Sequence, residues 1–140
     1  MSDHTEVQRV AAYGVAIDED RVLLVRASAT SHFAGAWSLP GGGVDHGEHP
    51  ADTVAREFGE ETGLAVRIDG PCAVFSDVVA IPSKTQRLHS VRLCYPVSVV
   101  GGSLRDERDG STDLARWVHL GEAARLPAIA PFVTAAIERA

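Results

Sequence analysis

The sequence is poor in cysteine and has no long hydrophobic run. Its two cysteines, Cys72 and Cys94, lie in apolar stretches without CxxC spacing, so neither a zinc site nor a disulfide framework is expected. No segment offers 18 uninterrupted apolar residues, and the polar N-terminus lacks the apolar core of a signal peptide. These absences predict a cytoplasmic protein that has no membrane partner and whose two thiols are free and buried.

Basic residues are also scarce. The chain has 13 Lys and Arg against 19 Asp and Glu, which gives a formal net charge of −6. No basic stripe is available to neutralise a nucleic-acid backbone, so duplex nucleic acid is not expected as a partner. An anionic small molecule remains compatible with this balance, because a metal ion held by acidic residues can supply the positive charge.

The size and composition predict one packed unit. The 140 residues, with 45% hydrophobic and 23% charged, are enough for one core and short for two. We therefore expect a single domain over residues 1–140, with residues 1–8 as a flexible N-terminus. No internal repeat or linker interrupts it.

Apolar runs bounded by turn residues predict a mixed architecture. The predicted strands are 9–17, 22–26, 37–39, 64–68, 73–80, 89–100 and 115–120, with turns at 18–21, 40–43 and 101–102. A central helix is expected to start at Pro50 and to end before Gly63, and a closing helix to run over 129–139. This order predicts an α/β (α+β) sandwich built on a mixed β-sheet.

The central helix carries a cluster of acidic residues. Glu57, Glu60 and Glu61 are spaced i, i+3 and i+4, which places their Cβ atoms about 5–6 Å apart, on a different arc from an apolar face that includes Ala51, Val54, Ala55, Phe58 and Thr62. Like charges at this spacing repel, and acidic groups in a last turn oppose the helix dipole. A sequence that is locally unfavourable in this way often marks a functional site.

A divalent cation would turn this repulsion into shared coordination. Oxygen ligands without a nearby thiolate favour Mg²⁺ or Mn²⁺ over zinc. The preceding Pro40-Gly41-Gly42-Gly43 segment lets the backbone approach an ion or a phosphate, and Glu48 offers a fourth carboxylate. Taken alone, the three glutamates fit an ordinary solvated helix face equally well.

A wider spacing separates these two interpretations. The pattern G-x5-E-x7-R-E-U-x-E-E-x-G-U, in which U is a bulky apolar residue, is reproduced by Gly42, Glu48, Arg56, Glu57, Glu60, Glu61 and Gly63, with Leu64 at the last position. Such a match arises by chance on the order of 10⁻⁸ per starting position. The sequence therefore resembles the Nudix hydrolase family, although Phe58 stands where the family usually has an aliphatic residue. Weaker similarity in 37–42 and 116–118 extends the resemblance over about 9–139.

The resemblance implies a fold and an activity. We expect a Nudix-type α/β/α sandwich that hydrolyses a phosphoanhydride bond in a nucleoside diphosphate linked to another moiety, such as ADP-ribose or a nucleoside triphosphate, with Mg²⁺ or Mn²⁺ as cofactor. Glu57 and Glu61 are the expected metal ligands, Glu60 a ligand or the general base, and the Gly41 carbonyl a further ligand. Arg56 is expected to orient the carboxylates. A homodimer is possible, because dimers are common in the family.

Outside this motif, the Nudix box (residues 42–64), the candidate site residues are weaker. Arg26, Arg92 and Lys84 could meet phosphates, and Asp113, Glu107 or Asp109 could add a carboxylate, although solvated surface roles are more usual for residues of these types. The candidates for substrate binding are Glu48, Arg26, Arg92 and Asp113. Trp37, Phe33, Phe75 and Tyr95 could stack a base or belong to the core. His32, His46 and His49 are interpreted as surface-loop residues.

Other functions remain open at this point. The same fold could bind a nucleotide without cleaving it, or catalyse another metal-dependent reaction such as prenyl diphosphate isomerisation. Intact box glutamates favour hydrolysis over the binding module. The substrate is not defined: ADP-ribose, an oxidised nucleoside triphosphate, a dinucleotide polyphosphate and a capped or sugar nucleotide all fit, and Pro82 lies near, but not at, the position typical of ADP-ribose hydrolases.

Overall fold

The computed structural model of the chain describes residues 4–31 and 33–140. Its strands are β1 (Thr5–Asp18), β2 (Arg21–Ala27), β3 (Trp37–Ser38), β4 (Gly41–Gly43), β5 (Leu64–Ile68), β6 (Ala73–Ile81), β7 (Gln86–Gly102) and β8 (Thr112–His119). Its helices are α1 (Pro50–Thr62), α2 (Leu120–Ala123) and α3 (Pro131–Arg139), with a 3-10 turn η1 (Pro82–Lys84). None of the helices in the two described ranges is long and apolar enough to cross a membrane.

Strand β1 connects the whole sheet system. From Thr5 to Ala16 it pairs in parallel with β7, and it pairs antiparallel with β4 at Ala11 to Tyr13. Its last residues, Ile17 and Asp18, pair with β2, which in turn pairs with β3 and β8. Strands β5 and β6 are antiparallel to β7. The predicted mixed sheet is therefore confirmed.

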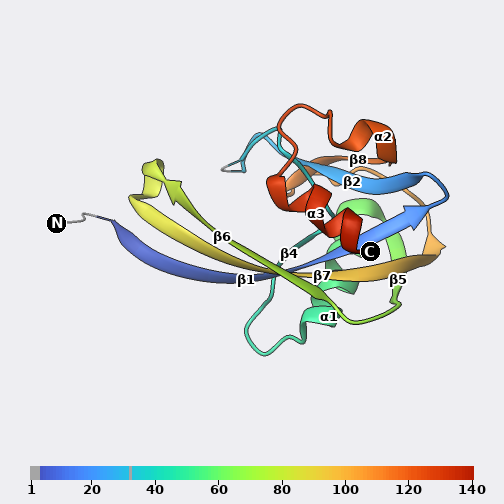
Figure 1. Ribbon diagram of the computed structural model, residues 1–140, viewed down its shortest axis with the longest axis horizontal. Coiled ribbons are helices and arrows are strands. Elements are labelled where there is room, and N and C mark those ends of the chain that lie inside the picture. The colour runs from blue at the N-terminus through green and yellow to red at the C-terminus, as the bar shows by residue number, and fades with distance from the viewer. Residues whose placement is uncertain (1–3, 32) are drawn as a thin grey trace.

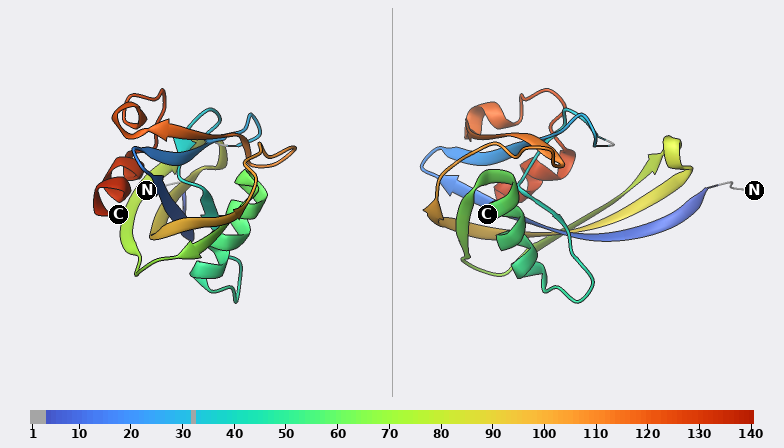
Figure 2. Two further views of the ribbon diagram at one scale, coloured as in Figure 1. Left: turned by 90° about the vertical axis from the view of Figure 1, so that its right-hand side faces the viewer. Right: turned by 180° about the vertical axis from the view of Figure 1, so that it is seen from behind.

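The apolar run in β1 is covered on both faces, as a continuous run of this kind requires. Tyr13 and Val15 belong to the core that includes side chains of α2 and α3, whereas Ala12 and Ala16 belong to the core that includes side chains of α1. Figure 1 shows α1 on one side of the strands and α2 and α3 on the other, an arrangement visible again in Figure 2. The expected α/β sandwich is confirmed.

Helix α1 starts and ends where the sequence predicts. Pro50 is its first residue, and His49 caps it by accepting a hydrogen bond from the backbone N–H of Ala51 at 3.0 Å. The helix ends at Gly63, whose φ of 76° is the left-handed conformation that favours glycine. Phe58 is fully buried in the core beside β1, whereas Ala55, expected on the apolar face, is exposed.

Three expectations about the strands differ from the structure. Residues 5–8 are paired with β7 and are not a flexible N-terminus, because β7 begins earlier than predicted, at Gln86; residues 1–3 lie outside the described residues. The glycines of 41–43 form β4, an edge strand on β1, where a turn was expected. Gly101 and Gly102 end β7 and pair with β5 where a turn was also expected.

Part of the sheet extends beyond the rest of the molecule. The first half of β1, the second half of β6 and the first half of β7 form a curved three-stranded arm, which projects away from both helical layers in Figures 1 and 2. Because side chains alternate along a strand, one face of this arm continues into the body of the protein beside β4. That face contributes to the cleft described below.

Replacing Phe58 by Ala should destabilise the protein strongly. The ring is fully buried, so its loss leaves a cavity between α1 and β1 and should lower the free energy of unfolding by about 3–5 kcal/mol. Urea denaturation followed by circular dichroism measures this change. Val74→Ala is the matched control, because Val74 is 57% exposed and its truncation should leave the free energy of unfolding nearly unchanged. Equal effects of the two substitutions would contradict the assignment of the core.

Candidate functional site

A cleft of about 480 Å³ lies between the strands, the loop before β3 and the start of α3. Its volume is in the range of pockets that hold small ligands. Glu57 and Glu61 of α1 line it together with the three glycines of β4, and Arg9, Asp77 and Arg92 line it from β1, β6 and β7. Two of the box glutamates therefore face a cavity, which is more than a solvated helix face requires.

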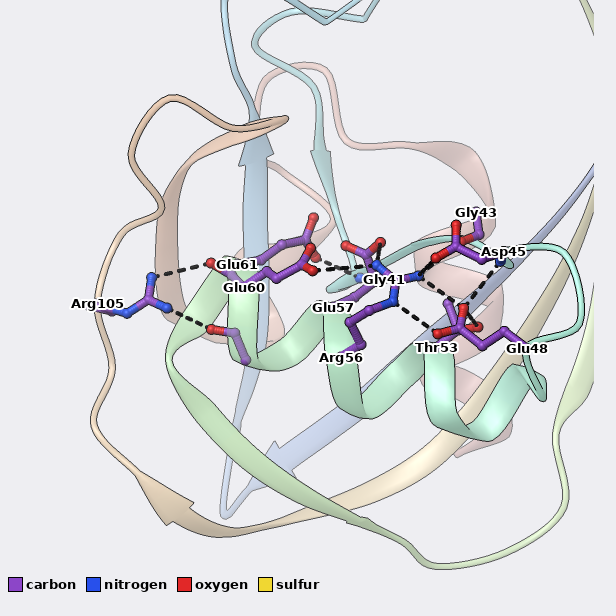
Figure 3. A network of polar contacts seen from close by, with 11 residues as sticks. Gly41, Gly43, Asp45, Glu48, Thr53, Arg56, Glu57, Glu60, Glu61 and Arg105 are labelled. Atoms are coloured by element: carbon purple, nitrogen blue, oxygen red, sulfur yellow. Dashed lines mark hydrogen bonds and ion pairs between the residues drawn. The ribbon is translucent and has the colours of Figure 1, made fainter.

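Arg56 of α1 connects the carboxylates of Glu48, Glu57 and Glu60 (Figure 3). Its guanidinium donates to both oxygens of Glu48, at 2.9 and 3.0 Å, and to Glu57 Oε1 at 3.0 Å. It also lies 3.5 Å from Glu60 Oε1 and donates to the Gly43 carbonyl at 3.3 Å. A planar guanidinium with this many partners has little freedom, so it fixes the positions of the acids around it.

Glu48 belongs to this support and does not face the cleft. Hydrogen bonds from Arg56 and from the Thr53 hydroxyl, the latter 2.6 Å long, lower the pKa of Glu48 to about 2. Its carboxylate therefore stays ionised at neutral pH and remains paired with Arg56. The expected role of Glu48 as a fourth ligand or substrate contact finds no support in this geometry.

Glu61 is an unusual residue for its location. It is 2% exposed, and the backbone N–H of Gly41 donates to its Oε1 at 2.8 Å. Burial, followed by the charge of Glu57, raises the pKa of Glu61 well above its usual range. Burial, followed by the charge of Glu60, also raises the pKa of Glu57, although Arg56 opposes the shift. Both carboxylates therefore lose their protons less readily than a free glutamate does.

Gly42 provides the space that Glu57 occupies. A Cβ atom at this position would lie 2.7 Å from Glu57 Oε1, closer than real side chains approach. The strand β4 that carries Gly42 is held on β1, so the backbone has little room to yield. A side chain at the first position of the motif would therefore displace the Glu57 carboxylate from the backbone of β4.

The donor set fits a hard divalent cation. The groups facing this end of the cleft are carboxylate oxygens, the ligands that hard divalent cations prefer. Burial raises the pKa of Glu57 and of Glu61, and a bound cation would offset that cost of ionisation. Within residues 4–31 and 33–140, however, no three His, Cys, Asp or Glu side chains already form a group spaced to hold a metal. Arg56 holds Glu57 and Glu60, while the N–H of Gly41 holds Glu61, so the three glutamates lie near one another without forming a finished ligand group.

Of the candidates outside the box, some line the cleft and others do not. Arg92 lines the cleft, but Arg26 and Asp113 pair with each other at 2.9 Å and are not among its lining residues. Glu107 is close enough to raise the pKa values of Glu57 and Glu61, and Asp109 is exposed. Lys84 lies in η1, at the tip of the arm.

The aromatic and histidine candidates lie partly in the cleft and partly in the core or at the surface. Phe33 lines the cleft and is 49% exposed, whereas Trp37 and Phe75 pack against the core near α3 and Tyr95 against the core near α1. His49 caps α1 and His46 is exposed, while His32 lies outside the described residues. Cys94 is buried and Cys72 is half-buried, and both are free thiols.

Sequence reasoning missed several cleft residues. Arg9, Tyr13, Asp77 and Phe132 line the cavity although nothing in their local sequence marks them. They come from β1, β6 and α3, which are far apart in the sequence: β1 and β6 each pair with β7, and α3 packs against β6. In β7, polar Ser90 and Arg92 alternate with apolar Val91 and Leu93, but this pattern does not distinguish a cleft from a solvated strand.

The family comparison agrees with the box. The NUDIX domain model matches residues 7–138, almost the whole chain. The chain belongs to the Nudix family. Its resemblance to that family is thereby confirmed, and Nudix hydrolases generally use divalent metal ions.

Individual relatives support the same assignment. The ADP-ribose pyrophosphatase of Methanocaldococcus jannaschii is 32% identical over 96 residues, which cover 69% of this chain and 54% of that protein. Among solved structures, a MutT NUDIX hydrolase from Burkholderia pseudomallei is 26% identical with a TM-score of 0.77, covering 94% of this chain and 97% of that one. A NUDIX hydrolase from Nitrosomonas europaea shares the fold, with a TM-score of 0.79 at 23% identity over 94% of this chain and 87% of that one. This Nudix chain spans about half the length, or less, of the curated relatives it matches.

A methyl group at Gly42 should damage the site without unfolding the protein. Gly42→Ala would force the Glu57 carboxylate away from β4, and a displacement of about 1 Å can reduce turnover by about 100-fold. Gly59→Ala is the matched control inside the same box: nothing lies within 4 Å of its Cβ position, and alanine in a helix adds up to about 1 kcal/mol of stability. Steady-state kinetics on any nucleotide that is turned over, with thermal melting, tests both. Equal activities of the two variants would contradict the role given to Gly42.

Proposed function

We propose that this chain hydrolyses a phosphoanhydride bond in a nucleoside diphosphate linked to another moiety, such as ADP-ribose or a nucleoside triphosphate, with Mg²⁺ or Mn²⁺ as cofactor. The observation that carries the proposal is the end of the cleft, where Glu57 and the buried Glu61 face a cavity of about 480 Å³ with insufficient positive charge of their own. Membership of the Nudix family and the similarity to an ADP-ribose pyrophosphatase support it.

The charges in the cleft argue for a cation between protein and substrate. Among the described residues, the lining contains the carboxylates of Glu57, Glu61 and Asp77 but only two cationic side chains, and one of these, Arg92, is paired with Asp77 at 2.7 Å. A diphosphate would meet net negative charge there. A bound divalent ion supplies the charge neutralisation and the Lewis acidity that the reaction needs.

The three glutamates would have different roles in metal binding and proton transfer. Glu57 and Glu61 would hold the cation, because they face the cleft. A bound cation would also stabilise their ionised forms, which burial disfavours. The Glu60 side chain is 50% exposed, and within the described part of the chain it is paired only with Arg56. It can therefore reach solvent and is the candidate to accept the proton of the attacking water or to complete the ligand set. Arg56 would orient Glu57 and Glu60 without touching the substrate.

Arg9 is the candidate contact for the diphosphate. It lines the cleft, and its guanidinium lies against Gly43, 3.3 Å from the position of a Cβ built there. No hydrogen bond or ion pair joins its side chain to any residue of the described ranges, so its charge is available to a ligand.

A homodimer and a cytoplasmic location remain predictions from the sequence.

A substrate panel tests the proposal. The protein is incubated with ADP-ribose, nucleoside triphosphates, dinucleotide polyphosphates and sugar nucleotides in Mg²⁺ or Mn²⁺, and the released phosphate species are identified. We expect hydrolysis of at least one nucleotide, abolished by a chelator. Tight binding of nucleotides without turnover would favour the non-catalytic binding module, and turnover of a prenyl diphosphate alone would favour isomerisation.

Substituting the glutamates should abolish activity without loss of stability. Glu57→Gln and Glu60→Gln should each lower kcat by about 100-fold or more. Because burial raises the pKa of Glu57 in the folded protein, its ionised form opposes folding above that pKa, so Glu57→Gln should melt at the same or a higher temperature in chelator at pH 8. Glu122→Gln, at an exposed site in α2, is the control and should change neither quantity. A large loss of thermal stability in the two box variants would contradict the assignment.

Removing the charge of Arg9 should weaken substrate binding. Arg9→Gln deletes one charge-assisted contact, which corresponds to a rise in KM of about tenfold with a small effect on kcat. Arg87→Gln is the control, since Arg87 lies on the same arm and lines a separate hollow beside Glu6. Initial-rate kinetics on the preferred nucleotide measures both. A KM for Arg9→Gln that equals the control value would remove Arg9 from the substrate site.

A further inference from the structure

Asp77 and Arg92 form an ion pair on the wall of the cleft. They extend from the neighbouring antiparallel strands β6 and β7, where Asp77 is opposite Ser90 and Phe75 is opposite Arg92. Arg92 Nη1 donates to Asp77 Oδ2 at 2.7 Å. Both residues line the same cleft as Glu57 and Glu61, yet the roles proposed above for the hydrolytic machinery do not use them.

A second contact fixes the orientation of the Arg92 guanidinium. The guanidinium of Arg92 lies 4.5 Å from the centre of the Phe132 ring, and Phe132 packs against Tyr13 with ring centroids 4.9 Å apart. A guanidinium held by a carboxylate and by an aromatic ring cannot turn freely. Arg92 therefore presents its remaining N–H groups in a fixed direction.

The pair has unused hydrogen-bonding capacity. Asp77 Oδ1 and Arg92 Nε are buried, and neither finds a hydrogen-bond partner within the described ranges. Leaving one acceptor and one donor of an ion pair unpaired is costly, and in a native protein it calls for an explanation such as a ligand. The Asp77 side chain keeps 38% exposure, and the terminal torsion of an aspartate is soft, so a molecule in the cleft can reach either carboxylate oxygen.

The position of the pair relates it to the glutamates. Ala11 of β1 pairs with Gly43 on one side and with Arg92 on the other, so two strand spacings, about 10 Å, separate Arg92 from β4. Glu57 lies against Gly42 in that same strand β4. A ribose and its phosphate span such a separation, with the phosphate near the glutamates and the base near Asp77 and Arg92.

We propose that Asp77 and Arg92 recognise the base of the nucleotide, which rests on the proposed function and names the part of the substrate that this wall selects. The pair offers one acceptor, on Asp77, beside donors on Arg92. Its complement is an uncharged planar edge with an N–H next to a carbonyl oxygen or ring nitrogen, which is the edge of a nucleobase. A phosphate does not fit, because the Asp77 carboxylate repels it and already offsets the charge of Arg92.

Binding of product-like ligands tests this site without requiring turnover. Calorimetry measures the dissociation constants of AMP, GMP, CMP and UMP against ribose 5-phosphate, which has no base. In the native chain, we expect at least one nucleotide to bind about tenfold more tightly than ribose 5-phosphate, as one or two good hydrogen bonds allow. In Asp77→Asn, the single side-chain oxygen stays paired with Arg92 and an NH₂ donor replaces the acceptor, so this tenfold difference should disappear while ribose 5-phosphate binds unchanged.

A matched control separates recognition from folding. Asp69→Asn alters another Arg–Asp pair, formed with Arg67 outside the cleft, and should preserve the difference between the nucleotide and ribose 5-phosphate. Arg92→Lys keeps the charge and removes the Nε donor, so it should behave like Asp77→Asn. If both cleft variants fail to fold, the native chain can be tested with a nucleotide whose base is methylated on the N–H that would donate to Asp77. This methylated nucleotide should bind no better than ribose 5-phosphate.

The possible results are distinct for the two proposals. No preference for any base in the native chain, or a preference that survives in Asp77→Asn or with the methylated base, would overturn base recognition by this pair. Equal weakening of nucleotide and ribose 5-phosphate in Asp77→Asn would also overturn it, since that result indicates a structural role. Absence of hydrolysis together with base-dependent binding would contradict only the proposed hydrolysis.

Discussion

Repulsion between buried carboxylates is the constraint on which this site depends. Glu57 and Glu61 lie at the end of one helix, inside a cleft, where burial raises the pKa of each. The protein opposes that cost with only a few contacts, from the guanidinium of Arg56 and the N–H of Gly41. What remains is a concentration of negative charge that a divalent cation would satisfy, and the rest of the cleft is arranged around this end.

The fold holds these charges together by covering β1 on both faces. One face of this strand packs against α1 and the other against the layer that contains α3, so the strand cannot move away from either. Pairing of β4 with β1 then places Gly41 and Gly42 against the carboxylates of Glu61 and Glu57. The geometry of the site therefore follows from the stability of the central strand. The pairing of β1 with β7, and of β7 with β6, builds the opposite wall.

The sequence predicts features that depend on residues close together in the chain, and it does not predict those that depend on how distant strands pair. Helix α1 was predictable to within a residue, because Pro50 and Gly63 mark its ends and its spacing defines which glutamates share a face. The contact of Arg56 with Glu60 follows from the same local spacing, whereas its contacts with Glu48 and Gly43 reach residues that precede the helix. Asp77 and Arg92 were not predictable as a pair, since they are 15 residues apart and meet only through the register of β6 on β7. Arg26 and Asp113, candidates for substrate binding, pair with each other across β2 and β8, which no local pattern indicates.

The most direct test of the central claim is the position of a cation. Crystals grown with Mn²⁺ and a non-hydrolysable nucleotide, measured at a wavelength where manganese scatters anomalously, locate the ion without assumptions about the ligands. The account predicts an anomalous peak at the end of the cleft, bound by oxygens of Glu57 and Glu61 and by the phosphates. A nucleotide bound in the cleft with the carboxylates of Glu57 and Glu61 facing away from its phosphates, and no manganese between them, would contradict it.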